Sequence, residues 1–249
     1  MARKKTGDGV RHRGASRFLN PAARWAGRLA LAAGALFVAY ELSILARIAW
    51  WRTHDPGPTA FMEARMEDLR AKRPGAKPRQ QWVPYARISP HLKRAVVAAE
   101  DAKFADHDGF DWEAMQKAWE KNQQRGKVVA GGSTISQQLA KNLFTTGART
   151  PWRKAQEAAA TVMLEAVLDK RRILELYLNV IEWGEGVFGA EAAARHYFGT
   201  PAASLTPEQA ARLAAMVPNP RFYDRNRQAP WLEKKTRILL ARMPSSEIP

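Results

Sequence analysis

The chain has 249 residues, no cysteine and a formal net charge of +16. This length is enough for one well-buried domain with extensions. The missing cysteine excludes a disulfide framework and thiolate metal sites, but it does not choose between a reducing and an oxidising compartment.

Much of the positive charge lies at the N-terminus. Residues 1–28 contain eight basic residues against one acidic residue, which predicts a basic tail. An apolar segment follows directly, so this tail favours anionic lipid headgroups as its partner and no nucleic acid is expected.

The apolar segment, residues 29–51, is predicted to be a transmembrane helix. About 20 apolar residues cross a bilayer core, and Trp50 and Trp51 are typical of its interface. Glu41 and Arg47 are its charged residues. A cleaved signal peptide and a buried core helix are the alternatives, but cleavage near Ala33 would leave most of the apolar run on the mature protein. By the positive-inside rule, residues 1–28 are cytoplasmic.

Residues 52–60 contain proline and glycine and are predicted to be a linker. The remainder, residues 61–249, is predicted to be one mainly helical domain, because runs of alternating polar and β-branched residues are rare in it. Its first helix is a charged amphipathic segment, residues 61–73. A capping box at Thr206 and Gln209 predicts a later helix to residue 216, and residues 231–243 form a last one.

Residues 89–111 are the most informative stretch. Ser89 followed by Pro90 predicts a helix start. Leu92, Val96 and Glu100 then share one face, which places a carboxylate on an apolar stripe near the helix end. Burial and the helix dipole both raise the pKa of such a glutamate, which suits a general base. The alternative is a helix end with scattered charges.

A second stretch, residues 131–144, reads GGSTISQQLAKNLF. Thr134 and Gln137 form a capping box, and the following helix has an apolar face and a polar face. The polar face carries Thr134, Gln138, Lys141 and Asn142. These side chains form either a solvated surface or a strip of donors for sugar hydroxyls and phosphate oxygens.

A third helix start lies at Thr150 and Pro151, with a helix predicted to about residue 169. Arg153 and Glu157 are spaced i, i+4, next to Lys154. Such a pair is ordinarily an exposed salt bridge worth about 0.3–0.5 kcal/mol. Residues 170–179 are predicted to be a further helix with a mostly buried face.

The order of these stretches resembles a known family. Glu-Asp-x-x-Phe-x-x-His-x-Gly-x-Asp at 100–111, the Gly-Gly-Ser-Thr stretch and Arg-Lys-x-x-Glu at 153–157 are similar to three signatures of the peptidoglycan glycosyltransferases. Two later stretches resemble the remaining signatures, so the likeness covers residues 89–223. These are lysozyme-like enzymes that polymerise lipid II. Because no transpeptidase domain follows, the resemblance is to the monofunctional biosynthetic transglycosylases.

The resemblance implies a mainly α fold, in which a lysozyme-like glycosyltransferase domain follows one transmembrane helix. It implies inverting transfer that builds β-1,4 glycan strands and releases undecaprenyl diphosphate. Glu100 would be the catalytic base and Glu157 the second catalytic acidic residue. The implied substrate-binding residues are Asp101, Phe104, His107, Thr134, Gln138, Lys141, Asn142, Arg153 and Lys154.

The resemblance also implies lipid II, the nascent glycan strand and other cell-wall synthases as partners. No tightly bound cofactor is expected. The resemblance implies Mg²⁺ or Mn²⁺ as an assisting ion, and Asp101 and Glu157 are the candidate ligands. The expected location is the inner membrane, crossed once, with the catalytic domain in the periplasm.

Two other functions compete with this interpretation. A membrane-anchored muramidase or lytic transglycosylase would place two carboxylates around a neutral sugar bond and would need no diphosphate-binding cations. A non-catalytic envelope scaffold would explain the charge and the anchor, but not a glutamate on an apolar stripe.

Overall fold

The computed structural model describes residues 21–145 and 150–249, so residues 1–20 of the predicted basic tail lie outside the described residues. The first element is the helix α1 (Pro21–Trp50). Residues Arg24–Trp50 contain an 18-residue window with a mean hydropathy of 2.0, of which only 6% is buried, and the helix is long and apolar enough to cross a membrane. This exposure contradicts a buried core helix and supports a membrane anchor.

Contacts divide the chain into two units, which meet between Ser43 and Ile44. The second unit therefore begins within α1 and includes the linker at residues 52–60. Ile44, Ile48 and Trp51 are buried in its core. The last turns of the apolar helix thus belong structurally to the helical domain.

The domain is mainly helical, as predicted. Its helices, in chain order, are α2 (Ala60–Lys72), α3 (Pro90–Glu100), α4 (Trp112–Arg125), α5 (Ile135–Phe144), α6 (Pro151–Val167), α7 (Lys170–Val180), α8 (Ala190–Phe198), α9 (Pro207–Met216), α10 (Pro220–Arg225) and α11 (Pro230–Arg242). The predicted helix starts are confirmed. Ser89 and Thr150 cap α3 and α6, and both predicted capping boxes are present on α5 and α9.

Two predicted boundaries differ by more than one residue, and the first is the apolar helix, which begins at Pro21 rather than at residue 29. The helix α6 ends at Val167 rather than near residue 169, because Leu168 is extended and the Asp169 side chain accepts a hydrogen bond from Arg172 N to cap α7. A negative side chain at this position compensates the unpaired N–H groups of the next helix.

A small sheet joins distant parts of the chain. It contains β1 (Arg79–Gln80), β2 (Glu182–Gly184) and β3 (Val187–Phe188) in the order β1-β3-β2. β1 runs parallel to β3, and β2 runs antiparallel to it. These strands were not predicted, because two or three residues are too few to show a period of two.

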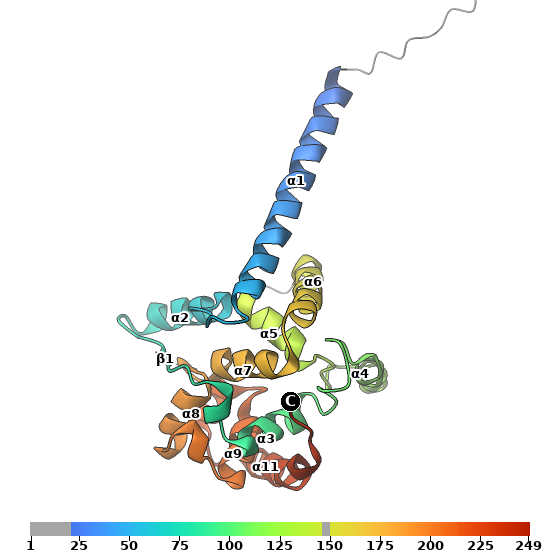
Figure 1. Cartoon of the computed structure of the whole chain (residues 1–249). Coiled ribbons are helices and arrows are strands. Elements are labelled where there is room, and N and C mark those ends of the chain that lie inside the picture. The colour runs from blue at the N-terminus through green and yellow to red at the C-terminus, as the bar shows by residue number, and fades with distance from the viewer. Residues whose placement is uncertain (1–20, 146–149) are drawn as a thin grey trace, which may run out of the picture. The chain divides into compact units, whose positions relative to one another are not determined.

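Two groups of packed helices position the site. α5 packs against α2, α6 and α7, while α3 packs against α9 and α11 (Figure 1). Leu92 and Val96 of α3, Leu139 of α5 and Leu174 of α7 are fully buried. The apolar faces predicted for α3 and α5 are therefore core, and the polar residues beside them are held in place by that packing.

Candidate active site

Glu100 is the last residue of α3 and is only partly exposed. Burial raises the pKa of its carboxyl, while a hydrogen bond from Gln138 and the charges of Lys235 and Lys141 oppose that rise. The predicted direction is thus confirmed, and its main cause is desolvation. A carboxylate with a raised pKa is a stronger proton acceptor, as a general base requires.

Two successive hydrogen bonds, from α7 to α5 and from α5 to α3, orient the Glu100 carboxylate. The Tyr177 hydroxyl donates to Gln138 Oε1 at 2.8 Å, and Gln138 Nε2 donates to Glu100 Oε2 at 3.0 Å. Tyr177 is fully buried, and burial raises its pKa well above the ordinary value, so the hydroxyl keeps its proton. Because that proton occupies the amide oxygen, the amide nitrogen must face Glu100.

Asp101 connects the first two signature stretches. Its Oδ2 accepts a hydrogen bond from Ile135 N, at the start of α5, at 2.9 Å. Its Oδ1 lies 2.9 Å from His107 Nε2, and Gly109 N donates to His107 Nδ1 at 3.2 Å. Since Nδ1 accepts, Nε2 carries the proton and donates it to Asp101. These side chains hold the loop after α3 against the start of α5.

The same loop needs glycine at residue 109. Gly109 has a φ of +91°, and an added Cβ would lie 2.9 Å from Thr161 Cγ2 and 3.0 Å from Glu165 Cγ. Its carbonyl accepts a hydrogen bond from Thr134 Oγ1 at 2.7 Å. Thr134, predicted to face substrate, is buried and engaged in this contact and in capping α5.

Phe104 lies in the core. Its side chain is fully buried, with its ring 4.7 Å from Lys170 Nζ. Among the predicted substrate-binding residues, Phe104 and His107 therefore lie behind the site, whereas Asp101 and Thr134 are buried but also line the cavity beside Glu100. Their roles toward substrate stay predictions.

The third stretch is not an exposed salt bridge. The Glu157 side chain is only 4% exposed, and it binds Arg153 Nη1 at 3.0 Å and Lys154 Nζ at 2.5 Å. One carboxylate thus holds two cations on the first turns of α6. Both cations lie close enough to α5 for their charges to act on Lys141 of that helix.

Lys141 of α5 joins this cluster. Burial lowers the pKa of its ammonium, Glu157 raises it, and the charges of Arg153 and Lys154 lower it further. Asn142, next to it, donates from Nδ2 to Gln138 O at 2.7 Å. The structure therefore brings Gln138, Lys141, Arg153 and Glu157 into one region beside Glu100.

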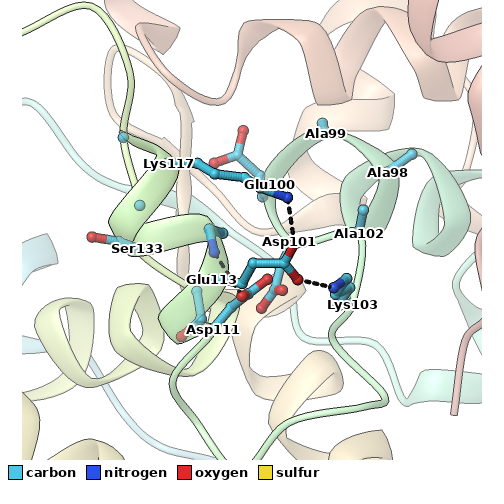
Figure 2. Close-up of a pocket in the computed structure, with 14 residues that line it drawn as sticks. Ala98, Ala99, Glu100, Asp101, Ala102, Lys103, Asp111, Glu113, Lys117 and Ser133 are labelled. Atoms are coloured by element: carbon cyan, nitrogen blue, oxygen red, sulfur yellow. Dashed lines mark hydrogen bonds and ion pairs between the residues drawn. The ribbon is translucent and has the colours of Figure 1, made fainter. Parts of the chain in front are cut away.

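Two cavities lie at this site, one lined by Glu100 and the other by Gln138. The Glu100 cavity, of ≈ 280 Å³, is lined by the end of α3, the start of α4 and the glycines before α5. Figure 2 shows Glu100 of α3 with Glu113 and Lys117 of α4 around it. The Lys141 cavity, of ≈ 170 Å³, is lined by Gln138, Lys141, Asn142 and Tyr177, together with residues of α2 and α10.

Sequence reasoning missed several residues here. Tyr177 was predicted only as part of a buried face, and its hydroxyl gave no separate signal. Lys235 of α11 carries a charge that lowers the pKa of Glu100, but it lies in a charged segment without a distinctive pattern. Glu113 binds Lys103 at 2.6 Å and also Lys117, and these hydrogen bonds lower its pKa to about 2.

The predicted metal ligands do not form a divalent-cation site. Asp101 accepts hydrogen bonds from His107 and from Ile135 N, and both Glu157 oxygens bind cationic side chains. Within residues 21–145 and 150–249, no group of three His, Cys, Asp or Glu side chains could hold a metal ion. A divalent ion would have to displace these protein donors.

A base with a raised pKa, placed near a cluster of cations, equips a group-transfer enzyme that activates a hydroxyl and stabilises an anionic leaving group. The chain belongs to the transglycosylase family, whose sequence model matches residues 67–244. The fold and the family thus confirm the resemblance seen in the sequence.

Close relatives are biosynthetic peptidoglycan transglycosylases. The one from Nitrosospira multiformis is 61% identical over 226 residues, which are 91% of this chain and 98% of the relative. The one from Dechloromonas aromatica is 62% identical over the same shares of the two chains. That of Laribacter hongkongensis is 60% identical and is covered to 99%.

Proposed function

We propose that this protein polymerises lipid II into linear β-1,4 glycan strands. The observation that carries the proposal is the placement of Glu100. Its carboxylate has a raised pKa, is oriented by Gln138, and lies between a cavity and a group of cations. Family membership and the names of the relatives support the same reaction.

The reaction is one inverting displacement. The 4-hydroxyl oxygen of the acceptor's terminal GlcNAc attacks C1 of the donor's MurNAc, and its proton passes to Glu100. The bond from C1 to the diphosphate oxygen breaks, and undecaprenyl diphosphate leaves with the electron pair. Attack opposite the α-linked leaving group produces the β linkage.

The leaving group needs charge stabilisation more than a proton. Lys141, Arg153 and Lys154 would supply it, because preorganised cations stabilise charge that develops in the transition state. Glu157 holds Arg153 and Lys154 in position rather than reacting. In this proposal the protein's own cations do what a divalent ion would otherwise do.

The cation cluster also disfavours a muramidase or lytic transglycosylase. Hydrolysis of a neutral glycosidic bond leaves no diphosphate to stabilise, and glycosidase chemistry ordinarily uses two carboxylates that flank the bond. Glu157, the second acidic residue of the predicted site, has both oxygens engaged by cations. The family and the relatives point to synthesis as well.

We also propose the orientation that this substrate requires. The basic tail stays in the cytoplasm, α1 crosses the inner membrane, and the domain lies in the periplasm, with other cell-wall synthases as partners. A periplasm-active reporter fused after Arg52 should give signal, and a cytoplasm-active reporter there should not. The reverse result would separate the domain from externalised lipid II and refute the proposal.

The direct test is to incubate the purified full-length protein with lipid II and to resolve the products on a gel. Polymer should form with the wild type and not with Glu100→Gln. Finished sacculi are the parallel substrate. Release of muropeptides from sacculi without polymer from lipid II would establish the lytic alternative instead.

A further inference from the structure

The wall of the Lys141 cavity contains a buried ion triad that the proposed mechanism does not use. Glu182 of β2 has a side chain only 3% exposed. Arg221 Nε, from α10, donates to Glu182 Oε1 at 2.7 Å, and Arg65 Nε, from α2, lies 3.3 Å from Glu182 Oε2. Both arginines also line the cavity. One carboxylate thus holds two guanidinium groups at its edge.

These arginines have unused hydrogen-bonding capacity. Arg221 Nη2 is buried and has no hydrogen-bond partner in the described part of the chain. A guanidinium carries five N–H donors in a rigid fork. Glu182 accepts a hydrogen bond from Arg221 Nε, whereas Arg65 is held as an ion pair and its Nε has no hydrogen-bond partner among the described residues. A buried donor without a partner is costly and asks for an acceptor. The Arg65 and Arg221 side chains are also 36% and 21% exposed and line the cavity, so their accessible edges can meet a ligand there.

Arg65 is also close to Lys141. The ring of Phe61, on α2, lies 4.7 Å from Arg65 Cζ and 5.5 Å from Lys141 Nζ. Positive charge is therefore gathered around one ring, and Glu157 and Glu182 are too few to balance it. Like charges brought together destabilise a fold unless an anion binds them.

We propose that Arg65 and Arg221, both held by Glu182, bind the diphosphate of the lipid-linked donor together with Lys141. The inference rests on the proposed function and adds two residues to it. A diphosphate suits the site because it offers several acceptor oxygens and more than one negative charge, whereas the sugars of the substrate offer neutral hydroxyls. Arg65 precedes residue 67, where the family match begins.

The competing explanation is that Arg65 merely joins α2 to the sheet. The chain provides a matched control for this. Arg73, at the end of α2, pairs with Glu185 at 3.1 Å, so it joins the same helix to the turn after β2. Its side chain is 70% exposed, and it does not line the cavity.

The experiment compares full-length Arg65→Ala with Arg73→Ala in the lipid II polymerisation assay. Arg65→Ala should raise KM for lipid II about 10-fold, the loss of one charge-assisted contact, with a smaller change in kcat. It should weaken inhibition by undecaprenyl diphosphate by a similar factor. Inhibition by uncharged undecaprenol should not change, and Arg73→Ala should behave as the wild type in both measurements. Equal effects of the two variants would overturn the proposal.

Arg65→Gln is the second variant, for the case that Arg65→Ala does not fold. Its amide keeps part of the length and polarity of the side chain but has no charge, so KM should rise in it too, and an unchanged KM would refute the inference. Arg65→Lys should restore part of the affinity. If the wild type itself forms no polymer, the proposed function fails. If the wild type is active and Arg65→Gln matches it, only this inference fails.

Discussion

Glu100→Gln separates the two consequences of a buried base, one on turnover and one on stability. An amide keeps the shape and can still accept the hydrogen bond from Gln138 Nε2, which spans 3.0 Å in the wild type. It cannot take the acceptor's proton. Loss of a general base costs about 10²–10⁴-fold in rate. Near-normal turnover in a lipid II assay would mean that the base is another residue.

The same substitution should stabilise the fold in a way that depends on pH. Burial raises the folded-state pKa of Glu100 above the ordinary value of 4.5. Between the unfolded-state pKa of 4.5 and the higher folded-state pKa, the folded wild type therefore binds more protons than the unfolded chain. Its free energy of unfolding falls as the pH rises through that window. Each unit of the rise is worth about 1.4 kcal/mol.

The measurement is thermal unfolding of both proteins at a pH below 4.5 and at neutral pH. The gain in Tm of Glu100→Gln should be larger at neutral pH, at about 2–4 °C per kcal/mol for a domain of this size. Glu113→Gln is a control of opposite sign, because Lys103 and Lys117 lower the pKa of Glu113 to about 2. An identical gain at both pH values would refute the raised pKa of Glu100.

Three further predictions follow from the same geometry. Lys141→Ala and Arg153→Ala should each lower lipid II affinity and turnover, by about 1.5–3 kcal/mol per lost charge-assisted contact. Titration of lipid II binding and the polymer assay measure the two effects. A residue whose variant is normal in both assays does not belong to the diphosphate site. Lys235→Met removes a charge that lowers the pKa of Glu100, so the acid limb of the plot of kcat against pH should move to higher pH. Lys234→Met, the control, should leave that limb in place. Coincident plots for the two variants would contradict an effect of Lys235 on Glu100. Deleting residues 1–43 should leave a folded domain that polymerises more slowly at vesicle surfaces, because anchoring raises effective concentration. Deleting residues 1–52 should also lower Tm, since it removes three buried side chains, and equal melting of the two truncations would show that the end of α1 is dispensable.

The sequence by itself determined the helix starts and the placement of Glu100 at the end of an apolar helix face. A cap is a local device, in which Thr134 and Gln137 bond each other three residues apart, so the residue types alone reveal it. Glu100 could be placed in an apolar environment for the same reason, because a helix face repeats every three or four residues. The order of the signature stretches then indicated the family, which the comparisons confirm.

Only the tertiary structure decided which of those residues meet. Gln138 reaches Glu100 across 38 residues of sequence, and Ile135 N reaches Asp101 across 34. Phe104 stands among the signature residues, yet it is fully buried in the core. Arg65 and Arg221 belong to separate helices that meet at Glu182. Such contacts depend on how α2, α3, α5 and α10 pack. That packing follows from the shapes of side chains across the whole core. The periodic pattern of apolar residues within one helix does not specify it.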